Sequence, residues 1–390
     1  MQDARIYLDH NATTPVDPQV IDAIARCLRE TSGNASSVHE DGRAARALVD
    51  EARAAVAALI GAQPADLVFT SCATEANNAA LRGMVEWLRR AHGDAMVLTT
   101  PVEHPSVLGP VAWLASHGVE VRTAPVDSLG RLDPDAVTRL LTPGRPTVVS
   151  VMLANNETGN VYPVGDIAGA AHEAGAIVHV DAVQAAGKLP LDVATLGADL
   201  LTLSAHKLHG PKGVGALWVR RGLKPAPLLL GGHQERGRRG GTENVPGIVG
   251  FGVAARVAAR AAAEPARIAA LRDRLWRGLE AMGAHRNGDP ERCLPNTLNV
   301  SVDGTEGEVV LASLDLAGVS VSSGSACTAG SLEPSHVLLA MGLSRERARA
   351  AVRFSLGRGT TAEEIDRVLS LLPDIVARTR GLSPRRNQSP

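Results

Sequence analysis

Short apolar segments alternate with segments of helical periodicity between Leu67 and Val219, and this alternation restricts the possible folds more than any other feature of the sequence. We expect strands at 67–70, 96–99, 119–123, 147–152, 176–180, 200–203 and 215–219, and helices at 75–91, 105–117, 133–141 and 164–174. Such alternation is typical of a mostly parallel sheet covered by helices on both faces. The predicted fold class is therefore α/β.

Polar residues follow several of these expected strands directly. They are Thr74, His104, Asn156, Asp181 and Lys207. Ligands of open α/β sheets bind at the carboxyl ends of the strands. The sequence therefore predicts that these side chains meet at one edge of the sheet and form a site.

The use of lysine points to the chemistry of that site. The chain has 40 basic residues, but its only lysines are Lys188, Lys207, Lys212 and Lys224. A lysine at the end of an apolar strand, in a chain that otherwise uses arginine, indicates an amine that arginine cannot replace, because a guanidinium neither deprotonates nor forms an imine.

Asp181 ends the strand before that of Lys207, and the pair suits pyridoxal phosphate. The lysine would hold the aldehyde, and the aspartate would keep the pyridine nitrogen protonated so that the ring accepts electrons. The structural alternative is a surface lysine with a helix-capping aspartate. Ser204 and His206, which flank the same turn, favour the cofactor interpretation.

The segments HVDAVQ (179–184) and SAHKLHGPKGVGALWV (204–219) resemble the cofactor segments of the cysteine desulfurases. These enzymes are class V aminotransferase-like proteins of the pyridoxal-phosphate fold type I. The resemblance runs from YLDHNATTP (7–15) to VRFSLGRGTT (352–361), and its most specific motifs are SAHKLHGPKG and SSGSACT. It implies a large cofactor-binding domain at 15–260, a small α+β domain at 1–14 and 261–380, and a flexible tail at 381–390.

The resemblance also assigns cofactor-binding residues. Asn156 and Gln184 lie beside the phenol oxygen, Asp181 faces the ring nitrogen, and His104 stacks on the ring and assists proton transfer. The phosphate-binding positions are Ala73, Thr74, Ser204, His206 and, from the facing subunit of a homodimer, Thr242. The unbonded donors at the start of a helix after 67–70 suit a phosphate, although Thr74 alone could be only a helix cap.

Substrate binding and sulfur chemistry rest on three further residues. The resemblance implies that Arg353 anchors the substrate α-carboxylate, with Asn156 and, less directly, Asn34 beside it. A guanidinium grips a carboxylate through two parallel hydrogen bonds, although an interface salt bridge is the alternative for Arg353. The family commonly has proline after the position of Asn34, whereas this chain has Ala35.

Cys327 lies in a run of small and hydroxyl residues, which is typical of an exposed loop. A catalytic thiolate needs access and a depressed pKa. The resemblance makes Cys327 the nucleophile that takes sulfur from L-cysteine as a persulfide, and a possible transient iron–sulfur ligand; no other metal site is expected. Cys72, beside the helix start, is expected to pack against the strand, and Cys27 to be inert in its helix.

The long loop around Cys327 resembles nitrogenase-associated and housekeeping desulfurases, and the chain stops soon after Leu382-Ser383-Pro384, which favours the nitrogenase-associated type. The expected partners are L-cysteine, an iron–sulfur scaffold or other sulfur acceptor, and a second copy of the chain. A selenocysteine lyase, a small-substrate aminotransferase and a non-catalytic assembly scaffold remain alternatives.

Charge and composition indicate which partners and which compartment to expect. The formal net charge of −1 gives no reason to expect binding to nucleic acid or a membrane surface. No apolar run approaches the roughly 20 residues that span a bilayer, and the segment MQDARIYLDH is not expected to be a targeting peptide. The four cysteines form no CxxC pair, which suits a reducing cytoplasm.

Overall fold

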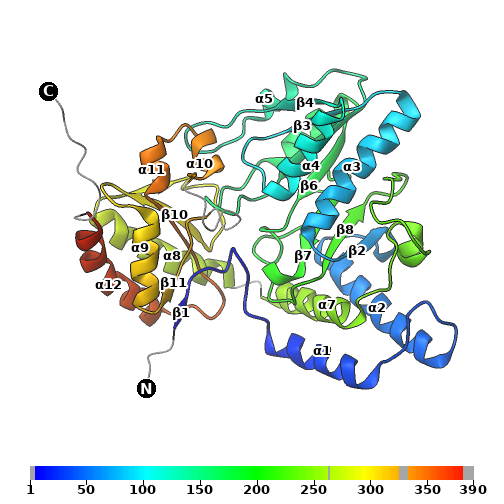
Figure 1. The fold of residues 1–390 in the computed structure, drawn as a ribbon, viewed down its shortest axis with the longest axis horizontal. Coiled ribbons are helices and arrows are strands. Elements are labelled where there is room, and N and C mark those ends of the chain that lie inside the picture. Colours follow the sequence, from blue (N-terminus) through cyan, green and yellow to red (C-terminus); the bar gives the residue numbers. More distant parts are fainter. Residues whose placement is uncertain (1–4, 262–263, 325–332, 381–390) are drawn as a thin grey trace.

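The computed structural model describes residues 5–261, 264–324 and 333–380, and its centre is a sheet of seven strands in the order β2-β8-β7-β6-β5-β3-β4 (Figure 1). The strands are β2 (Leu67–Thr70), β3 (Met96–Thr99), β4 (Glu120–Thr123), β5 (Thr147–Met152), β6 (Ile177–Asp181), β7 (Leu200–Ser204) and β8 (Gly215–Val219). Neighbours from β4 to β7 are parallel, and only the pairs that involve β8 are antiparallel. The predicted α/β class with a mostly parallel mixed sheet is confirmed.

β8 runs against its neighbour because the connection from β7 is short. It contains only the 3₁₀ helix η2 (Ala205–Lys207) and a turn, and parallel strands require a much longer crossover. The chain therefore reverses directly after Lys207, and this lysine sits at the tip of the connection between two fully buried strands.

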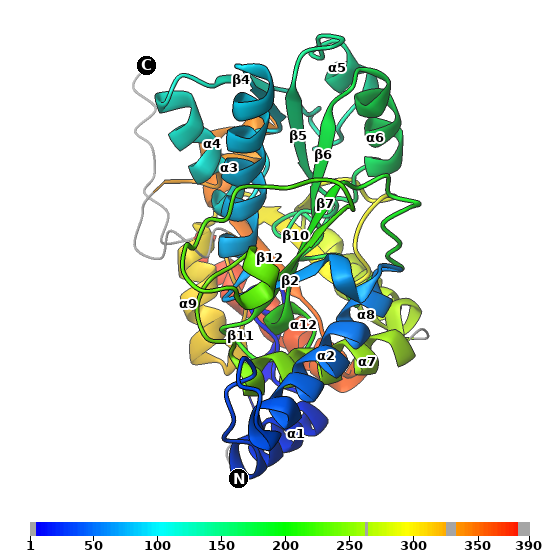
Figure 2. The same ribbon diagram turned by 90° about the vertical axis from the view of Figure 1, so that its right-hand side faces the viewer.

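Helices cover both faces of the sheet, as Figure 2 shows for β5 and β6. One face carries α3 (Ala73–His92) and α4 (Pro105–Ser116), whose apolar side chains share a core with the strands. The other face carries α2 (Glu40–Leu59), α5 (Pro134–Thr138), α6 (Val164–Glu173) and α7 (Val245–Arg260), and α1 (Pro18–Glu30) packs on α7. The central strands are buried throughout because both of their faces are covered.

A second, smaller body has its own apolar core. Its antiparallel sheet has the order β12-β10-β9, formed by β9 (Ala284–Asn287), β10 (Thr297–Val302) and β12 (Ala351–Ser355). The helices α8 (Glu264–Ala281), α9 (Gly307–Leu316) and α12 (Ala362–Arg380) pack around it, and α10 (His336–Ala340) and α11 (Arg345–Arg349) precede β12. β1 (Ile6–Tyr7) joins this body by pairing with β11 (Val319–Ser320).

The expected boundary at 260/261 falls where α7 ends, before α8 begins, and the expected tail at 381–390 lies outside the described residues. Periodicity did not single out β9, whose sequence AHRN contains no apolar run, or the helix α12.

No single described helix is long and apolar enough to cross a membrane; α7 and α8 meet that test only as a pair bent by 78°.

A buried ion pair fixes the loop that follows β8. Arg53 of α2 donates to both carboxylate oxygens of Glu235 at 2.7 Å each, and their side chains are 6% and 2% exposed. Glu235 also accepts from the backbone nitrogen of Phe69 in β2 at 3.0 Å, although its own φ of 48° lies in the disfavoured left-handed region. The pair therefore holds a strained backbone against the strand that leads to α3.

We expect Arg53→Met to lower the free energy of unfolding by about 3–5 kcal/mol, because it leaves a buried carboxylate without its partner. Urea unfolding followed by tryptophan fluorescence measures this. Arg256→Met is the matched control: it removes an exposed pair with Glu51 and should cost less than about 1 kcal/mol. Equal losses in the two variants would contradict the assignment.

Candidate active site

A cavity of about 300 Å³ lies at the carboxyl ends of the central strands, between the two bodies. It is lined by most of the predicted site residues: Ala73, Thr74, His104, Asn156, Asp181, Gln184, Ser204, His206, Lys207 and Arg353. These positions come from different strand ends and from the small body. The fold therefore brings together residues that are up to 280 positions apart in the sequence (73 to 353).

Lys207 enters the cavity from η2, directly after β7. Its Nζ donates to the backbone oxygens of Asn11 at 2.5 Å and Ala12 at 2.7 Å. His206, on the same turn, contacts Thr13 Oγ1 through Nδ1 at 3.2 Å, and its burial, with the charges of Lys207 and Lys212, lowers its pKa to about 4. At neutral pH this imidazole is uncharged.

Asp181 is held at the end of β6 by Asn77 of α3 and by the backbone that follows the strand. Its Oδ2 accepts from Asn77 Nδ2 at 2.8 Å, and its Oδ1 accepts from the backbone nitrogen of Val183 at 3.0 Å. Asn77 also donates to Ser106 Oγ at 2.9 Å. The carboxylate is thus fixed in a buried position at the floor of the cavity, where an acceptor for a protonated ring nitrogen is required.

His104 caps α4 and lines the cavity. Its Nδ1 accepts from the backbone nitrogen of Ser106 at 3.0 Å, which leaves Nε2 as the N–H of the neutral ring. Burial lowers the pKa of His104, and the charges of Lys207 and His336 lower it further, against the opposing effect of Asp181. The neutral form is therefore the one that faces the cavity near pH 7.

The turn between β2 and α3 has the features of an anion site. Among the described residues no side chain caps the start of α3, so its first backbone N–H groups lack a capping acceptor at the cavity edge that Cys72, Ala73 and Thr74 line. The strand β8 passes so close to this turn that a Cβ on Gly215 would lie 2.6 Å from the carbonyl carbon of Cys72. A glycine at this position allows the turn and the strand to approach.

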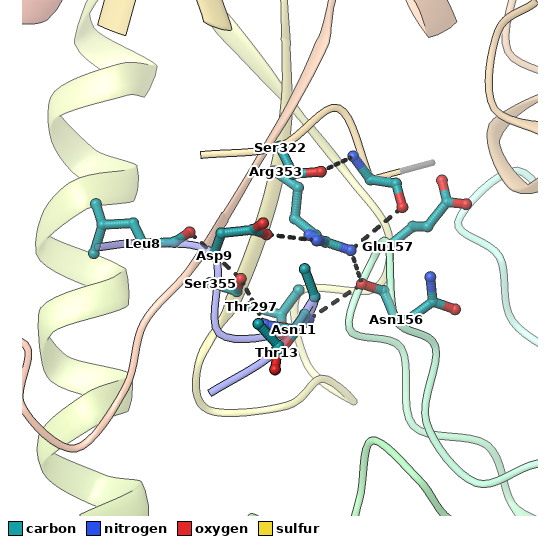
Figure 3. A network of polar contacts seen from close by, with 12 residues as sticks. Leu8, Asp9, Asn11, Thr13, Asn156, Glu157, Thr297, Ser322, Arg353 and Ser355 are labelled. Atoms are coloured by element: carbon teal, nitrogen blue, oxygen red, sulfur yellow. Dashed lines mark hydrogen bonds and ion pairs between the residues drawn. The ribbon is translucent and has the colours of Figure 1, made fainter. Parts of the chain in front are cut away.

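Arg353 rises from β12 into the same cavity and is 1% exposed (Figure 3). Its Nη2 donates to Asp9 Oδ1 at 2.7 Å, and its Nη1 donates to the backbone oxygens of Asn156 at 2.8 Å and Gly324 at 3.3 Å. Its Nε is buried without a hydrogen-bond partner in the described part of the chain. Arg353 therefore takes part in a salt bridge, with Asp9 as its partner. It also lines the cavity, as a residue that binds a substrate carboxylate must.

Two predicted residues lie apart from this cavity, and a third lies outside the described residues. Asn34 is exposed between α1 and α2, where its Oδ1 accepts from Ser36 N at 2.8 Å, and Thr242 is exposed in the loop before α7. Within one chain neither reaches the cavity, so their roles stay predictions. Cys327 lies outside the described residues, although Gly324, three positions earlier, lines the cavity.

Cys72 departs from its expected position. It was expected to pack against the strand, but it is half-buried and lines the cavity at the start of α3. The reason is that β2 ends at Thr70, so Cys72 belongs to the turn that opens toward the site and not to the strand. Cys27 is buried in α1, as expected.

Several residues that the sequence did not single out complete the site. Asn11, Asn77, Glu157 and His336 are the main ones. Glu157 accepts a hydrogen bond from Ser335 Oγ at 2.5 Å, and burial raises its pKa. Asn11 lies in the segment YLDHNATTP, and Asn77 lies in the helix expected at 75–91. Only their contacts in the folded chain reveal that Asn11 holds Lys207 and that Asn77 holds Asp181.

Comparisons with known proteins identify the family. The family model "Aminotransferase class-V" matches residues 6–368. The cysteine desulfurase of a Nostoc species is 50% identical over 389 residues, covering 98% of this chain and 95% of the relative. The cysteine desulfurase NifS of Azotobacter vinelandii is 47% identical over 385 residues, with coverages of 98% and 95%. A solved structure of a NifS-like protein superposes with a TM-score of 0.90 at 39% identity, covering 96% of this chain and 100% of the other.

The chain therefore belongs to the class-V aminotransferase family, and within it to the cysteine desulfurases, which depend on pyridoxal phosphate. The predicted family resemblance is confirmed.

The residues present fit this cofactor. Ser204 Oγ is buried and has no hydrogen-bond partner among the described residues, and it lines the cavity opposite the uncapped start of α3. Lys207 offers an amine for the aldehyde, and Asp181 offers a fixed carboxylate for the ring nitrogen. A phosphate, an aldehyde and a ring nitrogen therefore each find a suitable group along one cavity.

Glu103, next to His104, gives this region a dependence on pH. Its Oε1 accepts from Thr100 Oγ1 at 2.8 Å and Met152 N at 3.0 Å, and its burial raises its pKa to about 8. A carboxyl whose pKa is higher in the folded state keeps its proton there while the unfolded chain loses it. Stability from this group is therefore complete below the unfolded pKa of 4.5 and declines as pH rises toward 8.

As the pH rises from 6.5 to 8, we expect the free energy of unfolding of the wild type to fall relative to that of Glu103→Gln, because the amide cannot ionise. The wild type should lose up to about 1.4 kcal/mol of unfolding free energy per pH unit that the variant retains. Urea midpoints at pH 6.5, 7.2 and 8 measure the difference. The histidines, which also change charge near pH 6.5, are the same in both proteins and cancel in this difference. Parallel pH profiles for the two proteins would refute the assignment.

Proposed function

We propose that the protein is a cysteine desulfurase that converts L-cysteine to L-alanine and places the sulfur on Cys327 as a persulfide for iron–sulfur cluster assembly. The observation that carries the proposal is the single cavity in which Lys207, Asp181 and Arg353 meet, and which reaches Gly324. Its occupants would be a cofactor aldehyde, a ring nitrogen and a substrate carboxylate, the three groups that this reaction must hold.

Pyridoxal phosphate, when bound, supplies an electron sink for negative charge at the substrate Cα. Asp181 keeps its place for that purpose, because Asn77 and the backbone of Val183 fix both of its oxygens. Lys207 Nζ donates to the backbone oxygens of Asn11 and Ala12. An amine at this place is suited to accept the Cα proton in its neutral form.

The neighbouring residues orient the substrate. Arg353 supplies the buried positive charge for an α-carboxylate, and Asp9 of the N-terminal segment keeps the guanidinium in place. His104, neutral and with its proton on Nε2, lines the cavity and is placed to assist proton movement at the reacting carbons.

The sulfur step conserves atoms and charge. The Cys327 thiolate attacks the substrate sulfur and forms an S–S bond, while the substrate C–S bond breaks and its electron pair stays on carbon. Protonation of that carbon, together with return of a proton to Cα, gives L-alanine. The enzyme persulfide is a reversible state whose outer sulfur an acceptor thiol can take. An iron–sulfur scaffold of the cytoplasm, including one that serves nitrogenase, is the acceptor we propose.

Cys327→Ser should bind the cofactor normally but form no persulfide, because a hydroxyl cannot accept the sulfur. We expect wild-type protein treated with one equivalent of L-cysteine to gain the mass of one sulfur atom on Cys327 and to release L-alanine, as peptide mass analysis would show. Cys293→Ser, which lies outside the cavity, is the matched control and should keep the reaction. Sulfur found on Cys72, or a 2-oxo acid as product, would overturn the proposal.

We further propose that the active form is a homodimer in which Thr242 of one chain completes the phosphate site of the other. Thr242 is exposed, yet Arg239, three residues earlier, donates to Glu75 at 2.9 and 3.2 Å, and Glu75 accepts from Ser71 N at the phosphate turn. The loop is thus held in a defined position at the surface. Exposed apolar side chains at Ile21, Leu28, Val38 and Leu230 offer a surface for a second copy.

Subunit mixing tests this arrangement. Lys207→Ala and Thr242→Asp should each be nearly inactive alone, because one lacks the amine and the other places a negative charge beside the phosphate. Refolded or co-expressed together, they should regain activity, since a mixed dimer carries one site with neither change. A mixture no more active than its separate components would contradict a shared site.

A further inference from the structure

A second lysine lies beside the active site and has no part in the proposed reaction. Lys188 is half-buried in the segment after β6, four residues beyond Gln184. Its Nζ donates to Gln184 Oε1 at 2.7 Å and to Asn11 Oδ1 at 3.2 Å. In a chain with only four lysines, two of them therefore donate hydrogen bonds to the same residue, Asn11.

These contacts determine which way the Gln184 amide faces. An amino group donates hydrogen bonds, so the atom that it contacts must be the amide oxygen. The other end agrees independently, because Gln184 Nε2 donates to the backbone oxygen of Asn11 at 2.9 Å. With Oε1 taken by Lys188, the second N–H of Gln184 remains for the cavity that the residue lines.

The arrangement does not depend on the charge of Lys188. Burial, with the charges of Lys207 and Arg353, lowers the pKa of Lys188 well below its usual value. Both of its contacts are carbonyl oxygens, and a neutral amine has two N–H donors for them. The bonds that orient Gln184 are available to either protonation state.

Asn11 joins this pair to Lys207. Its backbone oxygen accepts from both Gln184 Nε2 and Lys207 Nζ, and its Oδ1 accepts from both Lys188 and Asn296 Nδ2, the latter at 3.0 Å. Asn11 is 1% exposed, so water does not compete for these atoms. Gln184 is therefore held at both ends of its amide beside the catalytic lysine.

We propose that Lys188 is a positioning residue that fixes the amide of Gln184 with its N–H toward the bound cofactor. This inference rests on the proposed function, in which Gln184 faces the phenol oxygen of pyridoxal phosphate. A donor toward that oxygen stabilises its negative charge and so favours the form of the bound cofactor that has lost a proton. If Lys188 is removed, Gln184 Oε1 loses its partner. The amide can then rotate so that its oxygen, and not its N–H, faces the phenol oxygen of the cofactor.

A pH titration of the visible absorbance of the holoenzyme tests the proposal. We expect Lys188→Met to raise the midpoint by about one pH unit, the effect of losing a hydrogen bond to a charged group. The charged and titratable groups that line the cavity, namely Lys207, Asp181, His104, His206, Arg353, Glu157 and His336, are the same in both proteins. Lys224→Met is the matched control, because that lysine is exposed and outside the cavity, and its midpoint should equal that of the wild type.

A double-mutant cycle separates positioning from other effects. In a Gln184→Met background, Lys188→Met should cause no further shift, because the amide through which it acts is absent. Lys188→Arg, which keeps N–H donors, should restore most of the wild-type midpoint. If Lys188→Met is not recovered folded, Lys188→Leu, which also lacks a donor, takes its place in the cycle.

Two results would overturn the proposal while leaving the proposed function intact: an unchanged midpoint in cofactor-loaded Lys188→Met, or a full shift that persists without Gln184. Failure of the wild type to bind pyridoxal phosphate would instead overturn the proposed function, and this inference with it.

Discussion

The burial of Asn11 is the constraint on which the site depends. This residue follows the first strand, and its N–H donates to Ser355 Oγ and its side chain to Thr297 in the small body, while its oxygens receive Gln184, Lys188 and Lys207 from the large one. A buried polar side chain is stable only if its hydrogen bonds are made. Each body therefore supplies what the other leaves unsatisfied, and the amine of Lys207 is placed as a consequence.

The charged side chain of Arg353 forms a second link between the two bodies. Arg353 of β12 is almost completely buried, and a guanidinium in that position requires a counter-charge and acceptors. Asp9 provides the charge from the N-terminal segment, and the backbone oxygen of Asn156 provides an acceptor from the large body (Figure 3). The residue expected to bind substrate is thus also part of the structural junction, so substrate binding and the relative position of the bodies are connected at one side chain.

Prediction from the sequence was accurate where a residue's role follows from its local pattern. The strands of the large sheet were predicted to within about a residue at each end, because buried parallel strands are continuous apolar runs bounded by polar turns. Lys207 and Asp181 could be singled out because each ends such a run. β9 was missed because its sequence AHRN is polar, and it is a strand only because it pairs with β10. Cys72 was misplaced although the end of β2 was predicted correctly, because the direction in which the following turn opens is set by packing against β8 and by the cavity.

The sequence by itself determined the α/β class, the set of strand-end residues and, through its motifs, the family. Local patterns are sufficient for these because hydrophobic periodicity and turn residues act between near neighbours in the chain. The tertiary structure alone decided that Asn77 holds Asp181, that Asp9 pairs with Arg353, and that Lys188 and Asn11 hold Gln184 at both ends of its amide. Hydrogen bonds of this kind depend on distance and direction between groups that are mostly far apart in sequence, and only the packing of the two bodies brings those groups within reach.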